Sequence, residues 1–293
     1  MQWSIARKVA ALWTMTKPLQ LFLLSVTLFG SYFAAGGRPD PQKLALLLLA
    51  SIGGIGGVTA LNMVIERDID SLMPRTSSRP LPAGVLTPGE ASIGVTALIV
   101  VGVLAAAAIN KFVAFSVLLG TLFDIVLYTD IAKRRTPVNI LLGGVAGGAP
   151  ALGGWAAARG SIDLGGLILS AIVMAWIPMH IWFISYYYRS DYARAGIPMA
   201  PVVMPTSRVA ALVKVSLAIM IGLAWSFVAV EGYGVVAATM TSIMSLLALA
   251  KIREWEKEPT RARARELFKF ASPIIAMLYM ALPIDYWLVS RIL

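Results

Sequence analysis

Long runs of apolar residues alternate with short polar segments along almost the whole chain. A helix needs about 20 apolar residues to cross a bilayer, and nine runs come near or exceed that length. We place these runs at residues 18–36, 43–65, 88–109, 112–129, 138–157, 163–186, 208–230, 234–251 and 270–290. The fourth run is interrupted by an acidic residue, Asp124. The pattern predicts an all-α membrane protein, a single transmembrane domain over residues 1–293 with about nine spanning helices.

The composition agrees with a polytopic membrane protein, because 58% of the residues are hydrophobic and only 14% are charged. If the nine runs alternate in direction, twenty of the 25 basic residues fall in loops on one side. The positive-inside rule places that side in the cytoplasm, with the amino terminus inside and the carboxyl terminus outside. The net charge of +10 is thus explained by topology and by attraction to lipid headgroups, so nucleic acid is not required as a partner.

Three polar segments stand out between the apolar runs. Residues 1–17 are predicted to form an amphipathic helix at the cytoplasmic surface, and they lack the layout of a signal peptide. Residues 66–87 and 187–207 are expected to be cytoplasmic segments, the first of them a proline-rich cap over a site.

Asp285, beside two aromatic residues, is expected to anchor the last span at the outer interface. The absence of cysteine excludes disulfides, thiolate metal sites and cysteine nucleophiles.

The first polar cluster follows the second apolar run directly. Asn62, Glu66 and Asp70 are spaced four apart, so a helix would place them on one face as a stripe about 12 Å long. Asp68 falls near the opposite face. Oxygen ligands of this kind suit Mg²⁺, which is usually held by one or two carboxylates together with water and substrate phosphate. The simpler alternative is a solvated loop after a membrane helix.

Basic residues lie close to this stripe and favour a phosphate ligand. Arg67, Arg75 and Arg79 follow it, and a guanidinium can hold phosphate oxygens through two hydrogen bonds. The basic triplet at 133–135 is predicted to lie on the same face of the membrane. Tyr128, just before the triplet, is either part of a binding site or an ordinary boundary residue. The intramembrane acid of the fourth run is a functional candidate by default.

A second polar cluster ends the sixth apolar run. Its members are His180, the only histidine, followed by Tyr187, Arg189, Asp191 and Arg194. The histidine is either a structural residue or a contact for haem or substrate. The two clusters lie at the inner ends of helices four spans apart, which predicts carboxylates that face one another across a bundle. The fifth run contains six glycines, which favours close packing or a backbone that lines a cavity.

Four stretches carry a resemblance to a known family. They are the stripe with ERDIDSLMPRTSSRPLPAG, then YTDIAKRRTPVNILLGGVAGGAPALGGWAA, then WIPMHIWFISYYYRSDYARAGIPMAPVV, and ELFKFASPIIAMLYMALPID near the end of the chain. Together they resemble the UbiA superfamily of intramembrane prenyltransferases, in particular its haem O synthase branch. The resemblance implies nine helices around a central cavity and Mg²⁺-dependent transfer of a farnesyl group from farnesyl diphosphate to the 2-vinyl group of haem B. It also implies a cell-membrane location and a protein partner in haem A synthesis.

The resemblance also implies roles for particular residues. It makes Asn62, Glu66, Asp70 and Asp191 the catalytic and metal-binding residues of the two diphosphate motifs. From their residue types and positions, we further expect the binding of diphosphate, prenyl chain or haem to involve Arg67, Lys133, Arg134, Tyr128, Tyr187, Arg189 and His180. Two positions depart from the family pattern, since Glu66 stands where aspartate is usual and Ser190 where a second acid is common.

Two other functions remain open on the sequence alone. A prenyltransferase of the same superfamily could act on an aromatic acid, a quinone precursor or a glycerol phospholipid precursor. Alternatively, intramembrane acids occur in ion-coupled transporters, where they relay ions instead of binding diphosphate.

Overall fold

The computed structural model describes residues 3–290, and every regular element within that range is a helix. Eight helices are long and apolar enough to cross a membrane, and the bent pair α1–α2 makes nine if it counts as one span. The all-α membrane prediction is therefore confirmed. The helices are α1 (Ile5–Met15), α2 (Pro18–Ala34), α3 (Pro41–Ser51), η1 (Ile52–Gly57), α4 (Val58–Ile65), α5 (Arg67–Leu72), α6 (Pro88–Ile109), α7 (Lys111–Thr121), η2 (Leu122–Ala132), α8 (Ile140–Arg159), α9 (Leu164–Tyr187), α10 (Arg189–Arg194), α11 (Ala200–Val203), α12 (Thr206–Glu231), α13 (Val235–Lys257) and α14 (Arg261–Val289).

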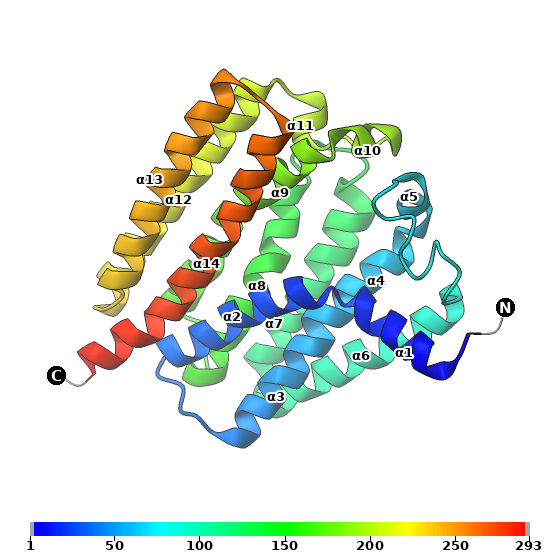
Figure 1. Ribbon diagram of the computed structural model, residues 1–293. Helices are drawn as coiled ribbons and strands as arrows, with labels where there is room; N and C mark the ends of the chain where they lie inside the picture. The colour runs from blue at the N-terminus through cyan, green and yellow to red at the C-terminus, as the bar shows by residue number, and fades with distance from the viewer. Residues whose placement is uncertain (1–2, 291–293) are drawn as a thin grey trace.

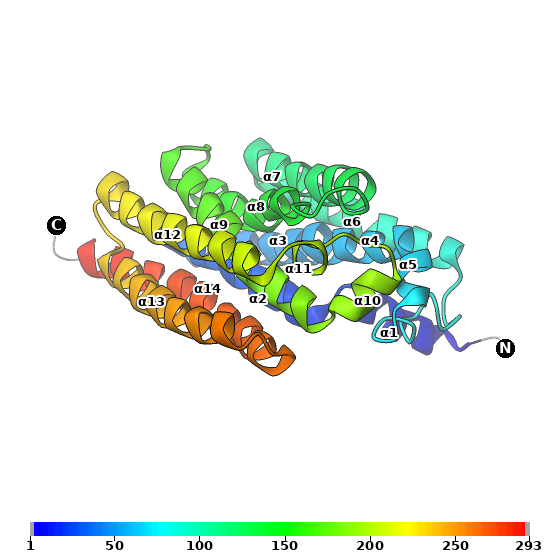
Figure 2. The same cartoon turned by 90° about the horizontal axis from the view of Figure 1, so that it is seen from above.

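Long helices that follow one another in the chain pack side by side, as α7, α8, α9, α12, α13 and α14 do in turn. The last of them, α14, packs back against α2 and so closes the bundle. The short helices α5, α10 and α11 lie together at one end, at the top of Figure 1. We call this end the motif end. Seen from above, α9 lies between α8 and α12, next to α14 (Figure 2).

Polar side chains at the turns explain why several spans begin where they do. Thr87 and Glu90 form a reciprocal capping box at the start of α6, with Pro88 in the first turn. Asp163 accepts hydrogen bonds from Gly166 N in α9 and, at 2.6 Å, from the Trp155 indole of α8. This carboxylate therefore caps one helix and ties it to its neighbour.

Two spans contain π-helical stretches, which the apolar pattern did not predict. η1 lies in the second span and η2 in the fourth, each in the half of its span nearer the motif end. At η1 the backbones of two helices are in close contact. A Cβ atom added at Gly102 of α6 would lie only 2.7 Å from the Cα of Gly53, so no side chain fits between them. Stretches of this kind often occur at functional sites. Here both lead into the polar segments that the sequence had singled out.

The structure corrects the expectation for Asp285. This side chain is buried and accepts hydrogen bonds from Val236 N at 3.1 Å and Ala237 N at 2.8 Å, in the first turn of α13. It is therefore an internal cap that joins α14 to α13, and not an interfacial anchor. A carboxylate suits this place because it faces unpaired amide groups and the positive end of the helix dipole.

Candidate active site

A cavity of about 550 Å³ opens inside the bundle and extends to the motif end. Most of the lining area is apolar, with leucines from α2, small residues from α8 and aromatic rings from α9 and α14. The glycine-rich α8 serves two purposes. Gly147 and Gly153 line the cavity, whereas Gly154 lies directly against the Leu28 carbonyl of α2. Small residues thus provide both the space and the close packing around it.

The acidic stripe lines the motif end of this cavity. Asn62, Glu66 and Asp70 are all buried, with 7%, 4% and 3% of their surface exposed. Although the chain changes from α4 to α5 at Glu66, the hydrogen bonds from Glu66 N to Asn62 O and from Asp70 N to Glu66 O, both 2.9 Å, are kept. The four-residue spacing therefore still places the three side chains along one line.

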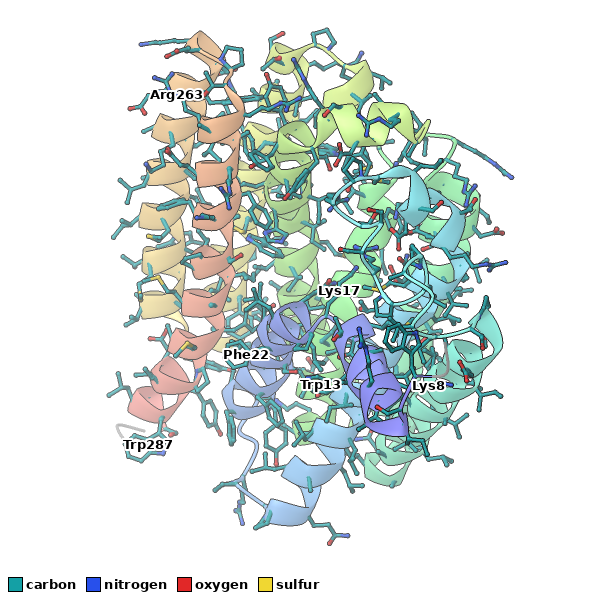
Figure 3. All side chains as sticks on the ribbon, turned by 45° about the vertical axis from the view of Figure 1, so that its right-hand side comes forward. Lys8, Trp13, Lys17, Phe22, Arg263 and Trp287 are labelled. Carbon is teal, nitrogen blue, oxygen red and sulfur yellow. The ribbon has the colours of Figure 1, made fainter. Side chains whose placement is uncertain are left out.

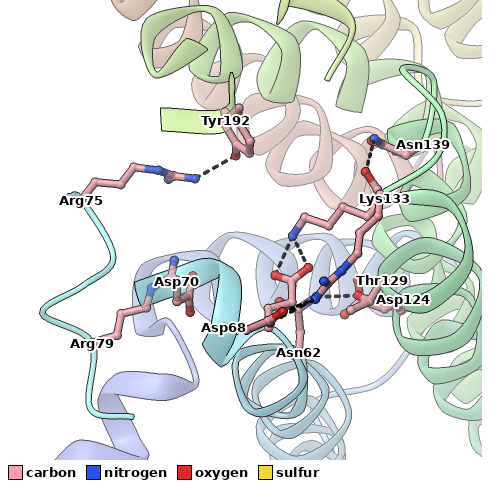
Figure 4. Close-up of polar contacts among 12 residues, drawn as sticks. Asn62, Asp68, Asp70, Arg75, Arg79, Asp124, Thr129, Lys133, Asn139 and Tyr192 are labelled. Carbon is pink, nitrogen blue, oxygen red and sulfur yellow. Dashed lines mark hydrogen bonds and ion pairs between the residues drawn. The ribbon is translucent and has the colours of Figure 1, made fainter. Parts of the chain in front are cut away.

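Each carboxylate of the stripe is paired with a cation that also lines the cavity. The ammonium of Lys133 lies within 2.6 Å of both oxygens of Glu66, and Arg79 Nη1 contacts both oxygens of Asp70 at 2.6 and 2.7 Å (Figure 4). Burial disfavours the charge of Lys133, but the Glu66 carboxylate, together with Tyr128 and Tyr192, outweighs this and raises the pKa of Lys133 above its usual value. Buried charges require such partners, and each carboxylate of the two pairs has one.

The amide of Asn62 connects the stripe to η2. Its Nδ2 donates to the Thr129 hydroxyl at 2.6 Å, and this hydroxyl donates to the backbone carbonyl of Asp124 at 2.7 Å. Because the amide donates through its nitrogen, its oxygen is left for a metal ion or another donor. Two helices far apart in the sequence are thus held in register at the polar end of the cavity.

An arginine from the segment after α5 reaches α10. Arg75 donates to the Tyr192 hydroxyl at 2.8 Å, and its guanidinium lies 4.8 Å from the ring centre of Tyr188. Both members of this hydrogen bond line the cavity, so the segments that carry the two polar clusters meet here. Asp191 precedes Tyr192, is partly buried and is not among the lining residues found within 3–290.

Other residues singled out from the sequence lie in different places. Tyr128 lines the cavity beside Lys133, whereas four residues lie outside the lining that the structure describes. These four are Arg67, which donates to Val64 O; Arg134, which pairs with exposed Asp68; Tyr187, which packs against Tyr188; and Arg189, which lies over the Tyr186 ring.

His180 lies in the wall of the cavity with an aromatic ring on each side. The Trp176 ring is stacked on it at 4.5 Å, and the Phe268 ring of α14 lies 4.6 Å away. Its buried Nδ1 has no hydrogen-bond partner within residues 3–290. An unpartnered ring nitrogen in an apolar wall is rare, and it leaves the imidazole able to bind a ligand.

Lys17 was missed by the sequence reasoning, which counted it only among the loop cations. It stands at the bend between α1 and α2, lines the cavity and has a φ of 48°, the only positive φ of a non-glycine residue within 3–290 (Figure 3). Arg79, Lys133 and Glu66 are close enough to influence its charge. Strained backbone of this type is often retained at functional sites. The one signal in the sequence was a lysine directly before the proline that opens a span.

The donors at the motif end fit a hard divalent cation. An amide oxygen and two carboxylates offer only oxygen ligands, which is the set that Mg²⁺ shares with substrate phosphates. Within residues 3–290, however, no three His, Cys, Asp or Glu side chains are gathered as a ready metal cluster. The set therefore fits a metal that arrives with a phosphate ligand better than one held by protein alone.

Comparison with known proteins gives concordant matches. The model of the UbiA prenyltransferase family matches residues 23–273. A protoheme IX farnesyltransferase from Aeropyrum pernix is 49% identical over 286 residues, 98% of this chain and 95% of that protein. The structure of a digeranylgeranylglyceryl phosphate synthase has a TM-score of 0.77 at 17% identity, covering 95% of this chain and 98% of that one. A UbiA homolog from Archaeoglobus fulgidus bound to GPP and Mg²⁺ has a TM-score of 0.69 at 17% identity, covering 93% and 99%.

Proposed function

Because the chain belongs to the UbiA prenyltransferase family, we propose that it is a multi-pass membrane enzyme that transfers a farnesyl group from farnesyl diphosphate to haem B, forming haem O. The near full-length similarity to a protoheme IX farnesyltransferase supports this acceptor. One structural observation carries the proposal. Two acid–cation pairs stand at the motif end of a mostly apolar cavity, which suits a substrate with a charged head and an isoprenoid tail.

The diphosphate would bind at the motif end. Asn62, Glu66 and Asp70 would hold Mg²⁺, with Asp191 reaching the same diphosphate from the second motif. Bound Mg²⁺ neutralises diphosphate charge and stabilises the charge that develops as the allylic carbon–oxygen bond breaks. Lys133 and Arg79 now pair with Glu66 and Asp70, so both cations can turn to phosphate oxygens once the carboxylates have a metal partner.

The apolar part of the cavity would hold the farnesyl chain. Its walls keep bulk water from the allylic cation, and aromatic faces such as those of Tyr128 and Trp176 attract positive charge. His180 lies between two rings in this wall, which supports a role as the contact for the haem iron or the porphyrin face. Arg67, Arg134, Tyr187 and Arg189 would act from outside the lining, by shaping the segments that cap the site.

Two alternatives can be weighed against the structure. The digeranylgeranylglyceryl phosphate synthase shares only 17% identity, so it supports the fold and not a phospholipid acceptor. The match to a family of prenyltransferases over residues 23–273 argues against an ion-coupled transporter. The amino terminus and the motif end would face the cytoplasm, as the distribution of basic residues predicts.

The proposal is tested with purified protein in lipid nanodiscs, farnesyl diphosphate, Mg²⁺ and either haem B or a phenolic acid. We expect diphosphate release coupled to a farnesylated haem, identified by mass, and no product in the presence of a chelator. Preferential alkylation of the phenolic acid would assign another acceptor class. Charge movement across vesicles without diphosphate release would instead indicate a transporter.

A further inference from the structure

Asp124 is an acidic residue of the fourth span that the proposed diphosphate site does not use. It lies within η2 and lines the cavity. Ionisable side chains in membrane spans are costly and rare, and they usually have a function. Within residues 3–290, its carboxylate makes neither a hydrogen bond nor an ion pair. Glu66 and Asp70 differ in this respect, because the oxygens of both are engaged by cations.

The position of Asp124 is fixed relative to the diphosphate site. Its backbone carbonyl accepts a hydrogen bond from the Thr129 hydroxyl, and this hydroxyl accepts one from the Asn62 amide. Because η2 runs towards Lys133 at the motif end, Asp124 lies about two helical turns deeper in the cavity than that cation. It therefore stands on the interior side of the proposed diphosphate site, the side towards which an allylic substrate would extend.

Charged side chains lie near the Asp124 carboxylate without forming ion pairs with it. Lys17 and Lys133 act on it with opposite charge and Glu66 with like charge, but none of them is within ion-pair distance. A free carboxylate facing a cavity, with charges near but not in contact, is a site for a bound water molecule. A water held there would be shielded from the bulk and directed at the interior of the cavity.

Formation of haem O requires such a water, because a hydroxyl is added as well as a farnesyl group. We propose that Asp124 binds this water and accepts its proton, an inference that rests on the proposed function. The terminal vinyl carbon bonds to farnesyl carbon 1 as diphosphate leaves with the carbon–oxygen electron pair. The positive charge passes to the inner vinyl carbon, the water oxygen bonds to it, and one water proton moves to the carboxylate of Asp124.

The inference is tested with Asp124→Asn, which keeps the shape of the side chain and removes its basicity. Wild type, Asp124→Asn and Asp124→Glu are supplied with haem B, farnesyl diphosphate and Mg²⁺ in water enriched in heavy oxygen. Diphosphate and haem products are quantified by mass. Asp130→Asn is the matched control, since Asp130 lies in the same helix and is exposed.

We expect Asp124→Asn to release diphosphate within a few-fold of the wild-type rate but to form at least about tenfold less labelled haem O. A farnesylated haem that is lighter by one water should accumulate, because the cation then loses a proton instead of gaining a hydroxyl. Asp124→Glu should restore the hydroxylated product, and Asp130→Asn should behave as wild type. A purely structural role would lower both products together and leave their ratio unchanged.

Two results overturn the inference while leaving the proposed function intact. These are an unchanged ratio of hydroxylated to dehydrated product in Asp124→Asn, and an equal loss of diphosphate release and haem O. Failure of the wild-type protein to farnesylate haem B would instead refute the proposed function, and the inference with it.

Discussion

The ammonium of Lys133 lies 2.6 Å from a carboxylate oxygen of Glu66, although 67 positions separate the two residues in the chain. This ion pair joins the end of the second span to the end of the fourth, and both partners line the cavity. A second pair, between Arg79 and Asp70, stands beside it. The site therefore holds acids for a metal and cations for phosphate in contact with one another before any substrate binds.

The two acids of the stripe should be essential for turnover. We expect Glu66→Gln and Asp70→Asn each to lower kcat by at least about 100-fold at saturating Mg²⁺, because each removes charge that holds the metal against the leaving group. Diphosphate release in nanodiscs measures this. Asp68→Asn is the control, since Asp68 is exposed and pairs with Arg134 outside the cavity. Wild-type rates for both stripe variants would disprove their role in metal binding.

Removing one member of the Lys133–Glu66 pair should cost more stability than removing both. Lys133→Met leaves a buried carboxylate unpaired, which costs about 3–5 kcal/mol, whereas Lys133→Met with Glu66→Gln should recover most of that loss. Thermal unfolding in detergent measures both. Because the pKa of Lys133 is raised above its ordinary 10.5, the pair should stabilise the fold fully at neutral pH and weaken only as pH rises through that higher value. Equal destabilisation by the single and double variants would contradict this.

Lys17 should contribute to diphosphate binding without contributing to stability. Lys17→Gly keeps the left-handed backbone and removes the charge, so we expect KM for farnesyl diphosphate to rise about tenfold, as for the loss of one charge-assisted hydrogen bond. The melting temperature should be unchanged or higher, because glycine adopts this φ without strain. Lys17→Arg restores the charge and should restore KM. An unchanged KM in Lys17→Gly would show that the ammonium does not reach the substrate.

His180 should affect the acceptor and not the donor. His180→Phe keeps the aromatic stack with Trp176 and Phe268 but removes the ring nitrogens, so we expect weaker binding of haem B with an unchanged KM for farnesyl diphosphate. Haem titration followed by its absorption spectrum measures this, and a spectral shift seen only in the wild type would indicate a nitrogen–iron bond. Identical spectra and affinities in both proteins would place haem elsewhere.

Asp285 should matter for stability alone. Asp285→Ala removes the acceptor for two amides in the first turn of α13, and we expect a loss of about 1–2 kcal/mol. Asp285→Asn keeps one acceptor oxygen and should lose less. Turnover per folded molecule should stay at the wild-type value, because Asp285 does not line the cavity that residues 3–290 form. A fall in turnover without a fall in melting temperature would argue for a functional role.

The spans and the acidic stripe could be predicted because each follows from local periodicity. Membrane-length apolar runs identify helices directly, and a spacing of four places Asn62, Glu66 and Asp70 on one face even across the change from α4 to α5. The partners of these residues were harder to predict. Nothing local in the sequence indicates that Lys133 pairs with Glu66, since that contact depends on how the second and fourth spans pack. The pairing of Arg79 with Asp70 depends on how the segment after α5 folds back on it.

Other features escaped prediction because a membrane helix is apolar on all sides. Such a helix shows no polar face, so the π-helical register of η1 and η2 leaves no trace in the pattern. From the sequence, Lys17 resembled an ordinary boundary residue. The left-handed backbone that directs it inward arises from the bend between α1 and α2, which the apolar pattern does not reveal. The place of Asp191 outside the lining likewise depends on the course of α10 and not on its spacing from Arg189.

The wider winding of η2 makes the protein sensitive to chain length at one place. Lys133 N bonds to the carbonyl of Tyr128, five residues back, so the last turn before the cation holds one residue more than an ordinary turn. Deleting a single residue between Leu122 and Ala132 would let this stretch take α-helical winding with Lys133 still facing Glu66. Adding a residue there would instead turn every side chain beyond it by about 100° around the axis, and Lys133 would face away from Glu66.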